Sequence, residues 1–232
     1  MTRKLVLFDI DGTLLLTAGA GRRAILAALR EEIGEWAAFD QVRFDGKTDP
    51  QIVAELFHVA GHPQPSGSER VRAIGIRYVE LLARELGQPT SRTTVMPGVP
   101  SLLDRLEADP GVVLGLLTGN LADGAALKLR SGQIDPRRFR VGAYGSDSAE
   151  RSELPPIAAR RAERWFGRLP VGSEIVIIGD TPADVTCGLG VAARAVAVAT
   201  GSHSVADLEA CAPHAVFEDL SDTGRVLEAI LA

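Results

Sequence analysis

The sequence predicts an α/β protein built on a doubly wound parallel sheet, with an α-helical domain inserted after the first strand. Three observations support this prediction. Short apolar runs alternate with amphipathic helical patterns over most of the chain. These runs are apolar almost throughout, which is typical of strands covered by helices on both faces. Between residues 17 and 92 only helical patterns occur.

Five segments predict the strands of this sheet. Each is short, mostly aliphatic and bounded by turn-forming residues. They are KLVLF (4–8), GVVLGLL (111–117), EIVII (174–178), RAVAVA (194–199) and the shorter AVF (215–217). Because their apolar character is nearly continuous, both faces of the sheet are expected to be covered.

Helical periodicity fills the intervals between these strands. Apolar residues recur at helical spacing at 102–106, 121–129, 157–165 and 226–230. Strands that alternate with helices are typical of βαβ units, which form parallel sheets with right-handed crossovers. The sequence therefore predicts a doubly wound parallel sheet.

The stretch after the first strand departs from this alternation. It holds three helical patterns, at 25–33, 52–57 and 71–82. Two breaker-rich segments separate or end them, GHPQPSGS (61–68) and GQPTS (87–91). Helices without strands are expected to form a small bundle of their own. We therefore predict an α/β core made of residues 1–16 and 93–232, with a helical domain of residues 17–92 inserted in it.

Composition and charge narrow the class of protein. The 232 residues are 46% hydrophobic, enough for a sizeable core. A net charge of -5 without a basic stripe argues against nucleic acid as a partner. No apolar run approaches the ~20 residues of a membrane span, and Asp9 and Asp11 interrupt the N-terminal run too early for a secretory signal. Two scattered cysteines suit a reducing compartment, so we expect a soluble cytoplasmic protein.

Polar and acidic residues follow three of the predicted strands. They are Asp9, Asp11, Gly12 and Thr13 after the first strand, Thr118, Gly119 and Asn120 after the second, and Asp180 and Asp184 after the third. Ligands of open parallel sheets bind beyond the carboxyl ends of the strands. If these three strands are parallel and adjacent, four carboxylates and a hydroxyl group meet at one edge.

Four carboxylates at one edge raise one another's pKa values unless a cation binds them. Mg²⁺ suits a few carboxylates together with water and a phosphate. Each aspartate taken alone has a simpler explanation, since Asp is favoured in turns and at helix N-caps. Because the acids recur at successive strand ends, we favour a magnesium site.

Three motifs resemble those of the haloacid dehalogenase superfamily of phosphatases. They are DIDGT at residues 9–13, Thr118 after an apolar strand, and GDTPAD at residues 179–184. The resemblance covers nearly the whole chain, because the helical insert lies where this superfamily places a helical cap domain. It implies a phosphatase of the kind represented by phosphoglycolate phosphatases.

The resemblance implies a covalent mechanism that uses Mg²⁺. Asp9 would attack phosphorus and form an aspartyl-phosphate, which divides one slow hydrolysis into two easier steps. Asp11 would protonate the leaving alcohol and later accept a proton from water. The metal would be bound by Asp9, Asp180 and the backbone carbonyl of Asp11. Asp184 would bind it directly or through water.

The resemblance also implies where the phosphate binds. The Thr118 hydroxyl would donate a hydrogen bond to a phosphate oxygen, together with the backbone N–H groups of Gly119 and Asn120 at a helix start. Thr118 taken alone could equally be a helix N-cap. Its place between the other motifs favours phosphate binding.

One basic residue is expected between the second and the last motif, where this superfamily usually has a lysine. The segment GSDSAERSELPPIAARRAE has no lysine, and Arg151 stands where that lysine is normally followed by prolines. We assign Arg151 this role, although its planar guanidinium contacts oxygens differently from a lysine. Lys128 and Lys47 are the alternatives, and a solvated surface charge is the simplest interpretation of Arg151.

The segment FDGKTDPQI (44–52) opens a helix of the cap. Thr48 or Asp49 can cap that helix, with Pro50 in its first turn. The same segment can also form a substrate-specificity loop that closes over the site and excludes water. In that case Lys47 would meet an anionic part of the substrate.

We expect hydrolysis of a small phosphorylated metabolite, by a monomer or homodimer that binds neither nucleic acid nor a membrane. Phosphotransfer within a sugar phosphate, as in β-phosphoglucomutases, is the enzymatic alternative. Dehalogenation is disfavoured, because attack on carbon leaves no alcohol for Asp11 to protonate. A non-catalytic binding protein on the same fold is the remaining alternative, and the presence of all the acids argues against it.

Overall fold

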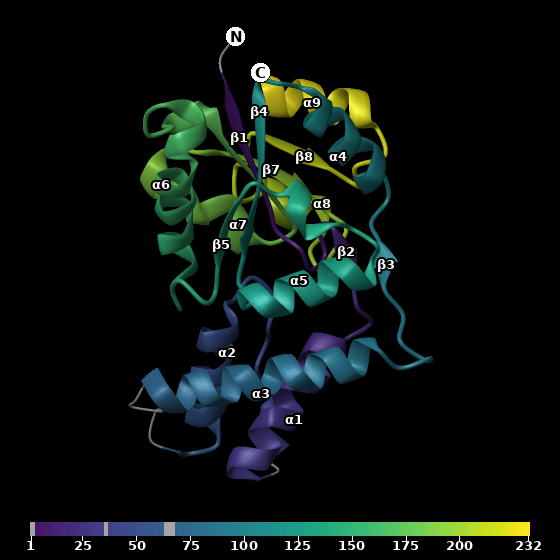
Figure 1. Cartoon of the computed structure of the whole chain (residues 1–232), viewed down its shortest axis with the longest axis vertical. Helices are drawn as coiled ribbons and strands as arrows, with labels where there is room; N and C mark the ends of the chain where they lie inside the picture. The colour runs from purple at the N-terminus through teal and green to yellow at the C-terminus, as the bar shows by residue number, and fades with distance from the viewer. Residues whose placement is uncertain (1–2, 35–36, 63–67) are drawn as a thin grey trace.

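The computed structural model describes residues 3–34, 37–62 and 68–232. Its centre is a six-stranded sheet with the order β5-β4-β1-β6-β7-β8, in which every neighbouring pair is parallel (Figure 1). The strands are β1 (Lys4–Phe8), β4 (Val112–Thr118), β5 (Val141–Tyr144), β6 (Ile175–Gly179), β7 (Arg194–Val198) and β8 (Ala215–Phe217). β1 therefore lies in the middle of the sheet, between β4 and β6.

The five predicted strands are all present, each within one residue at either end. The sequence pattern does not predict β5, a four-residue strand with glycine at its second position. Nor does it predict β2 (Leu15–Leu16) and β3 (Thr94–Val95), which pair with each other as short antiparallel strands. Strands this short are difficult to distinguish from loops by periodicity.

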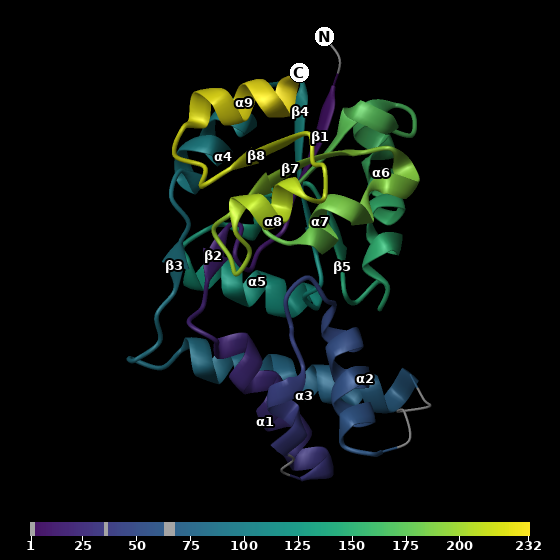
Figure 2. The ribbon, with the colours of Figure 1, turned by 180° about the vertical axis from the view of Figure 1, so that it is seen from behind.

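Helices cover both faces of the sheet (Figures 1 and 2). Side chains alternate along β1, so Val6 and Phe8 pack on one face, and Leu5 and Leu7 on the other. The first face is covered by α4 (Val99–Ala108), α5 (Ala122–Ser131) and α9 (Thr223–Leu231), and the second by α6 (Leu154–Phe166), α7 (Pro182–Cys187) and α8 (Val205–Glu209). The predicted α/β fold with a parallel sheet is confirmed.

Three further helices lie beyond the carboxyl ends of the central strands and form the helical layer (Figures 1 and 2). They are α1 (Ala20–Ile33), α2 (Asp49–Val59) and α3 (Ser68–Leu86). These helices share a hydrophobic core that includes Ile25, Leu56 and Tyr78. Most of the breaker segment 61–68 lies outside the described residues. The helical insert is present, and its division from the core at residues 16/17 and 92/93 stays a prediction.

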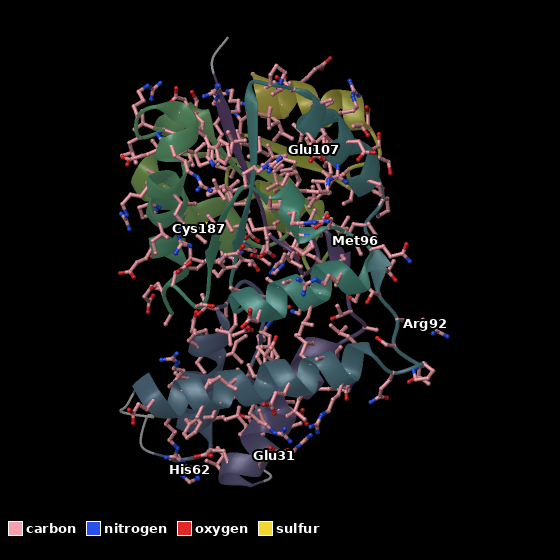
Figure 3. All side chains as sticks on the ribbon, viewed as in Figure 1. Glu31, His62, Arg92, Met96, Glu107 and Cys187 are labelled. Atoms are coloured by element: carbon pink, nitrogen blue, oxygen red, sulfur yellow. The ribbon has the colours of Figure 1, made fainter. Side chains whose placement is uncertain are left out.

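The chain passes between the sheet and the helical layer through the β2–β3 pair. Leu15 pairs with Val95 and Leu16 with Thr94. Figure 3 labels Arg92 and Met96 on either side of β3. Arg92 is exposed, whereas Met96 is buried in the core of the α/β part. The chain therefore enters the α/β core at β3.

Short 3-10 helices complete the described secondary structure. They are η1 (Ala37–Gln41), η2 (Pro136–Arg138), η3 (Arg151–Glu153), η4 (Gly172–Glu174) and η5 (Leu189–Val191). Among the described residues, no helix has both the length and the apolar character needed to cross a membrane.

Candidate active site

The three strands that carry the motifs end at the same edge of the sheet. Phe8 of β1 pairs with Leu116 of β4 on one side and with Ile178 of β6 on the other. The residues that follow these strands therefore meet, as predicted. A cavity of about 400 Å³ opens between this edge and the helical layer, and its lining includes Asp9 and Thr118.

Three buried carboxylates form the centre of the site. One oxygen each of Asp9, Asp180 and Asp184 lies within 4.8 Å of the others. The Thr13 hydroxyl donates a 3.0 Å hydrogen bond to Asp180 Oδ1. The backbone N–H and the hydroxyl of Thr181 donate to Asp184 Oδ2, at 3.0 and 2.7 Å. Neither role is predicted from the sequence, although Thr13 and Thr181 stand inside the motifs DIDGT and GDTPAD.

The ionised form of these buried carboxylates is destabilised when no metal cation is bound. Burial, together with the charge of the neighbouring Asp184 carboxylate, raises the pKa of Asp9 to about 6 and that of Asp180 to about 9. A divalent cation favours ionised carboxylates and reverses this effect. The all-oxygen donor set of the three aspartates therefore fits a hard cation such as Mg²⁺.

Arg151 lies inside the carboxylate cluster. Its Nη2 atom lies 3.1 Å from Asp9 Oδ1 and also contacts Asp184 Oδ1. The side chain is buried, and its Nε atom has no hydrogen-bond partner among the described residues. The interpretation of Arg151 as a solvated surface charge is therefore wrong. Arg151 lies directly beside Asp9, and its role as the basic residue of the site stays a prediction.

Lys128 of α5 occupies a different part of the site. Its Nζ atom lies 2.6 Å from Asp11 Oδ2 and 2.6 Å from Asn120 Oδ1. Burial lowers the pKa of Lys128, but the carboxylates of Asp11 and Asp49 outweigh burial, so the pKa is raised. The Asp11 carboxylate is partly exposed and is not a member of the three-carboxylate cluster. Arg151 and Lys128 thus contact different acids.

The first residue of α2 and the residue before it are hydrogen-bonded to loops of the α/β core. The Asp49 N–H donates to the Gly119 carbonyl oxygen at 2.7 Å, and Asp49 Oδ2 accepts from the Leu121 N–H at 2.8 Å. The Thr48 hydroxyl donates to the Ala149 carbonyl oxygen at 2.7 Å. The sequence pattern indicates Asp49 only as a helix cap, because these contacts join residues that are far apart in the sequence.

The same segment also caps α2, as the alternative interpretation expects. Thr48 Oγ1 accepts from the Gln51 N–H at 3.2 Å, and Pro50 lies in the first turn. Lys47 lines the cavity, with its Nζ atom paired to Glu55 of α2. Glu55 therefore competes with an anionic ligand for the Lys47 ammonium group.

Comparisons with known proteins agree with this geometry. The model of the haloacid dehalogenase-like hydrolase family matches residues 3–190. No curated protein matches this chain. Among solved structures, a hydrolase from Pseudomonas syringae has a TM-score of 0.74 at 21% identity over 98% of each chain. A predicted phosphoglycolate phosphatase from Haemophilus somnus 129PT has a TM-score of 0.70 at 18% identity, over 98% of this chain and 99% of that one.

A protein from Bacteroides vulgatus that is provisionally named a beta-phosphoglucomutase has a TM-score of 0.67 at 19% identity, over 99% of this chain and 89% of that one. At such identities the likenesses show the fold alone. The family match covers most of the residues and includes all the acids of the site. The chain belongs to the haloacid dehalogenase-like hydrolase family.

Proposed function

We propose that the protein is a Mg²⁺-dependent phosphatase that hydrolyses a small phosphomonoester through an aspartyl-phosphate at Asp9. The observation that carries this proposal is the contact of Arg151 with Asp9 inside a cluster of three buried carboxylates. Phosphoryl transfer needs such an arrangement of a nucleophile, a fixed cation and oxygen ligands for a metal. We also propose a cytoplasmic monomer or homodimer that acts on a phosphorylated metabolite.

The reaction proceeds in two steps. First, a carboxylate oxygen of Asp9 attacks phosphorus, the bond from phosphorus to the leaving oxygen breaks, and Asp11 gives its proton to that oxygen. Then water attacks the phosphorus of the aspartyl-phosphate, Asp11 accepts a proton from that water, and the Asp9 carboxylate leaves. The products are the alcohol and inorganic phosphate. Arg151, 3.1 Å from Asp9, stabilises negative charge on the reacting oxygens.

Mg²⁺ would be held by the carboxylates of Asp9 and Asp180 and by the backbone carbonyl of Asp11, with Asp184 directly or through water. When bound, it polarises the phosphoryl oxygens as a Lewis acid. Thr13 keeps the Asp180 carboxylate in orientation through its 3.0 Å hydrogen bond.

Three donors after β4 are the proposed phosphate ligands. They are the hydroxyl of Thr118 and the backbone N–H groups of Gly119 and Asn120. Thr118 is fully buried, and all three residues line the cavity that holds Asp9. The start of α2 covers this loop through the hydrogen bonds of Asp49 with Gly119 and Leu121, which supports a role in excluding water. Lys47 would contact an anionic part of the substrate after release from Glu55.

Release of inorganic phosphate from a panel of small organic phosphates tests the proposal. With Mg²⁺ present, we expect the wild type to turn over at least one of them. The Asp9→Asn variant keeps the size of the side chain but lacks the nucleophile, so its rate should fall by at least about 1,000-fold. Equal rates for the two proteins contradict the proposal.

Phosphotransfer within a sugar phosphate is the second candidate. The hydrogen bonds of Asp49 to Gly119 and Leu121 favour it, because a mutase must shield its intermediate from water. β-Glucose 1-phosphate with a bisphosphate activator distinguishes the two reactions. Formation of glucose 6-phosphate without inorganic phosphate indicates a mutase, whereas release of inorganic phosphate indicates hydrolysis.

A further inference from the structure

A chain of hydrogen bonds runs from α5 to the end of β4. Lys128 Nζ donates to Asn120 Oδ1 at 2.6 Å, and Asn120 Nδ2 donates to Thr118 Oγ1 at 2.8 Å. Lys128 Nζ and Asn120 Nδ2 also donate to Asp11 Oδ2, at 2.6 and 2.8 Å. Lys128 and Asn120 are each 5% exposed, and Thr118 is fully buried. Water therefore has little access to the contacts among Lys128, Asn120 and Thr118.

The donor groups of the Lys128 ammonium fix which atoms donate and which accept along this chain of hydrogen bonds. An ammonium group has three donors and no acceptor, so Asn120 must turn its oxygen toward Lys128. The amide nitrogen then faces the Asp11 carboxylate and the Thr118 oxygen, which both accept. The reversed amide would place its N–H groups against the ammonium and its oxygen against the carboxylate, so it is excluded.

The orientation of the Asn120 amide determines whether the Thr118 hydroxyl accepts or donates. Its oxygen accepts from the Asn120 side chain, so its hydrogen must point elsewhere. Within residues 3–34, 37–62 and 68–232, no acceptor binds this hydrogen. Because Thr118 lines the same cavity as Asp9, the hydrogen is available to an oxygen of a bound phosphate.

We propose that Lys128 is a positioning residue that, through Asn120, sets Thr118 as a hydrogen-bond donor to the phosphate. The inference rests on the proposed phosphatase function and gives roles to two side chains that need not touch the phosphate. Gly21 of α1 makes room for the ammonium group, because a Cβ there would lie 3.1 Å from Lys128 Nζ. α1 therefore lies close to the end of the Lys128 side chain.

Binding of inorganic phosphate in the presence of Mg²⁺, measured by calorimetry, tests this proposal. Lys128→Met and Asn120→Ala are each made in the wild type and in Thr118→Val. In the wild-type background, each should weaken phosphate binding by about 10- to 100-fold, as for loss of a hydrogen bond to a charged group. In the Thr118→Val background, each should change binding by less than about twofold, because the hydroxyl that it orients is gone.

Two outcomes overturn the proposal. Equal losses in both backgrounds mean that Lys128 acts on phosphate only as a charge, and unchanged binding in the wild-type background means that it has no role. Asn120→Ala keeps the ion pair of Lys128 with Asp11 and therefore decides the matter if Lys128→Met does not fold.

Lys4→Met is the matched control. Lys4 is also buried, but its Nζ atom binds the carbonyl oxygens of Ser173 and Ala232 at the other end of β1. Its replacement should leave phosphate binding unchanged. Failure of the proposed function is seen separately, because the wild type then releases no phosphate from any phosphomonoester, while phosphate binding still reports on Lys128.

Discussion

Alanine in place of Gly119 tests whether the segment that leads into α2, at Lys47 and Thr48, belongs to the active site. A Cβ at Gly119 would overlap the Lys47 carbonyl oxygen and lie 2.8 Å from Thr48 Cα. These are backbone atoms, so no change of rotamer relieves the overlap. Gly119 does not have a positive φ angle, so alanine is itself unstrained there. The variant also keeps the backbone N–H that we propose binds phosphate.

The magnitude follows from the hydrogen bonds that the overlap disrupts. Withdrawal of the segment breaks the 2.7 Å bond from Asp49 to Gly119 and the 2.8 Å bond from Leu121 to Asp49. A neutral hydrogen bond contributes about 0.5–1.5 kcal/mol and one to a charged group about 1.5–3 kcal/mol. The docked state should therefore lose about 2–4 kcal/mol, which is roughly a 30- to 1,000-fold change in its population.

Two assays measure this loss. The kcat/KM for the best phosphomonoester should fall at least about 30-fold, and hydrogen exchange at the amides of Asp49 and Leu121 should become faster. Gly124→Ala is the control, because its Cβ would lie 3.6 Å from Leu82, at ordinary contact distance. Wild-type kcat/KM and wild-type amide protection in Gly119→Ala would show that the docking of α2 on the β4 loop is not needed for activity.

Three further predictions concern the carboxylate cluster. Mg²⁺ at 100 times its dissociation constant should stabilise the wild type by about 2.7 kcal/mol, or roughly 5–10 °C in a thermal melt, and should not shift Asp180→Asn. Without metal, the pKa of Asp180 is raised to about 9, so the folded state binds more protons than the unfolded state. The free energy of unfolding should therefore decrease between about pH 4 and pH 9 more steeply in the wild type than in Asp180→Asn, and equal slopes in denaturant titrations contradict this. Gly201→Ala should abolish the Mg²⁺ shift, because its Cβ would overlap Asp180 Oδ2, whereas Gly190→Ala, with nothing within 4 Å of its Cβ, should keep the shift.

The central strands can be predicted because both of their faces are buried. β1 shows this, since all five of its residues are buried and four of them are aliphatic or aromatic. β5 cannot be predicted in this way, because it has four residues and the Tyr144 ring occupies the space of a Cβ at Gly142. Its strand conformation comes from parallel pairing with β4, a tertiary contact that a local pattern does not contain.

The site residues likewise differ in whether the sequence alone predicts that they lie together. Asp9, Thr118 and Asp180 can be placed together from sequence, because parallel strands bring their carboxyl ends to one edge. Arg151 can be proposed from sequence because it stands where the superfamily usually has a lysine followed by prolines. Lys128 is predicted from sequence only as an alternative to Arg151, and its contact with Asp11 across 117 residues of chain depends on the packing of α5. The contact of Asp49 with Gly119 likewise depends on how the helical layer sits on the sheet.

Three glycines show that the arrangement of the carboxylate cluster depends on more than the aspartates themselves. Gly12 and Gly201 both leave space that the Asp180 carboxylate fills, and Gly179 does the same for Asp184. Gly12 and Gly179 stand inside the motifs, whereas Gly201 follows β7 in a segment without any motif. The proposed cation site therefore depends as much on where the chain lacks a Cβ as on where it carries a carboxylate. Gly201→Ala separates the two contributions, because it changes none of the acids and still displaces the carboxylate of Asp180.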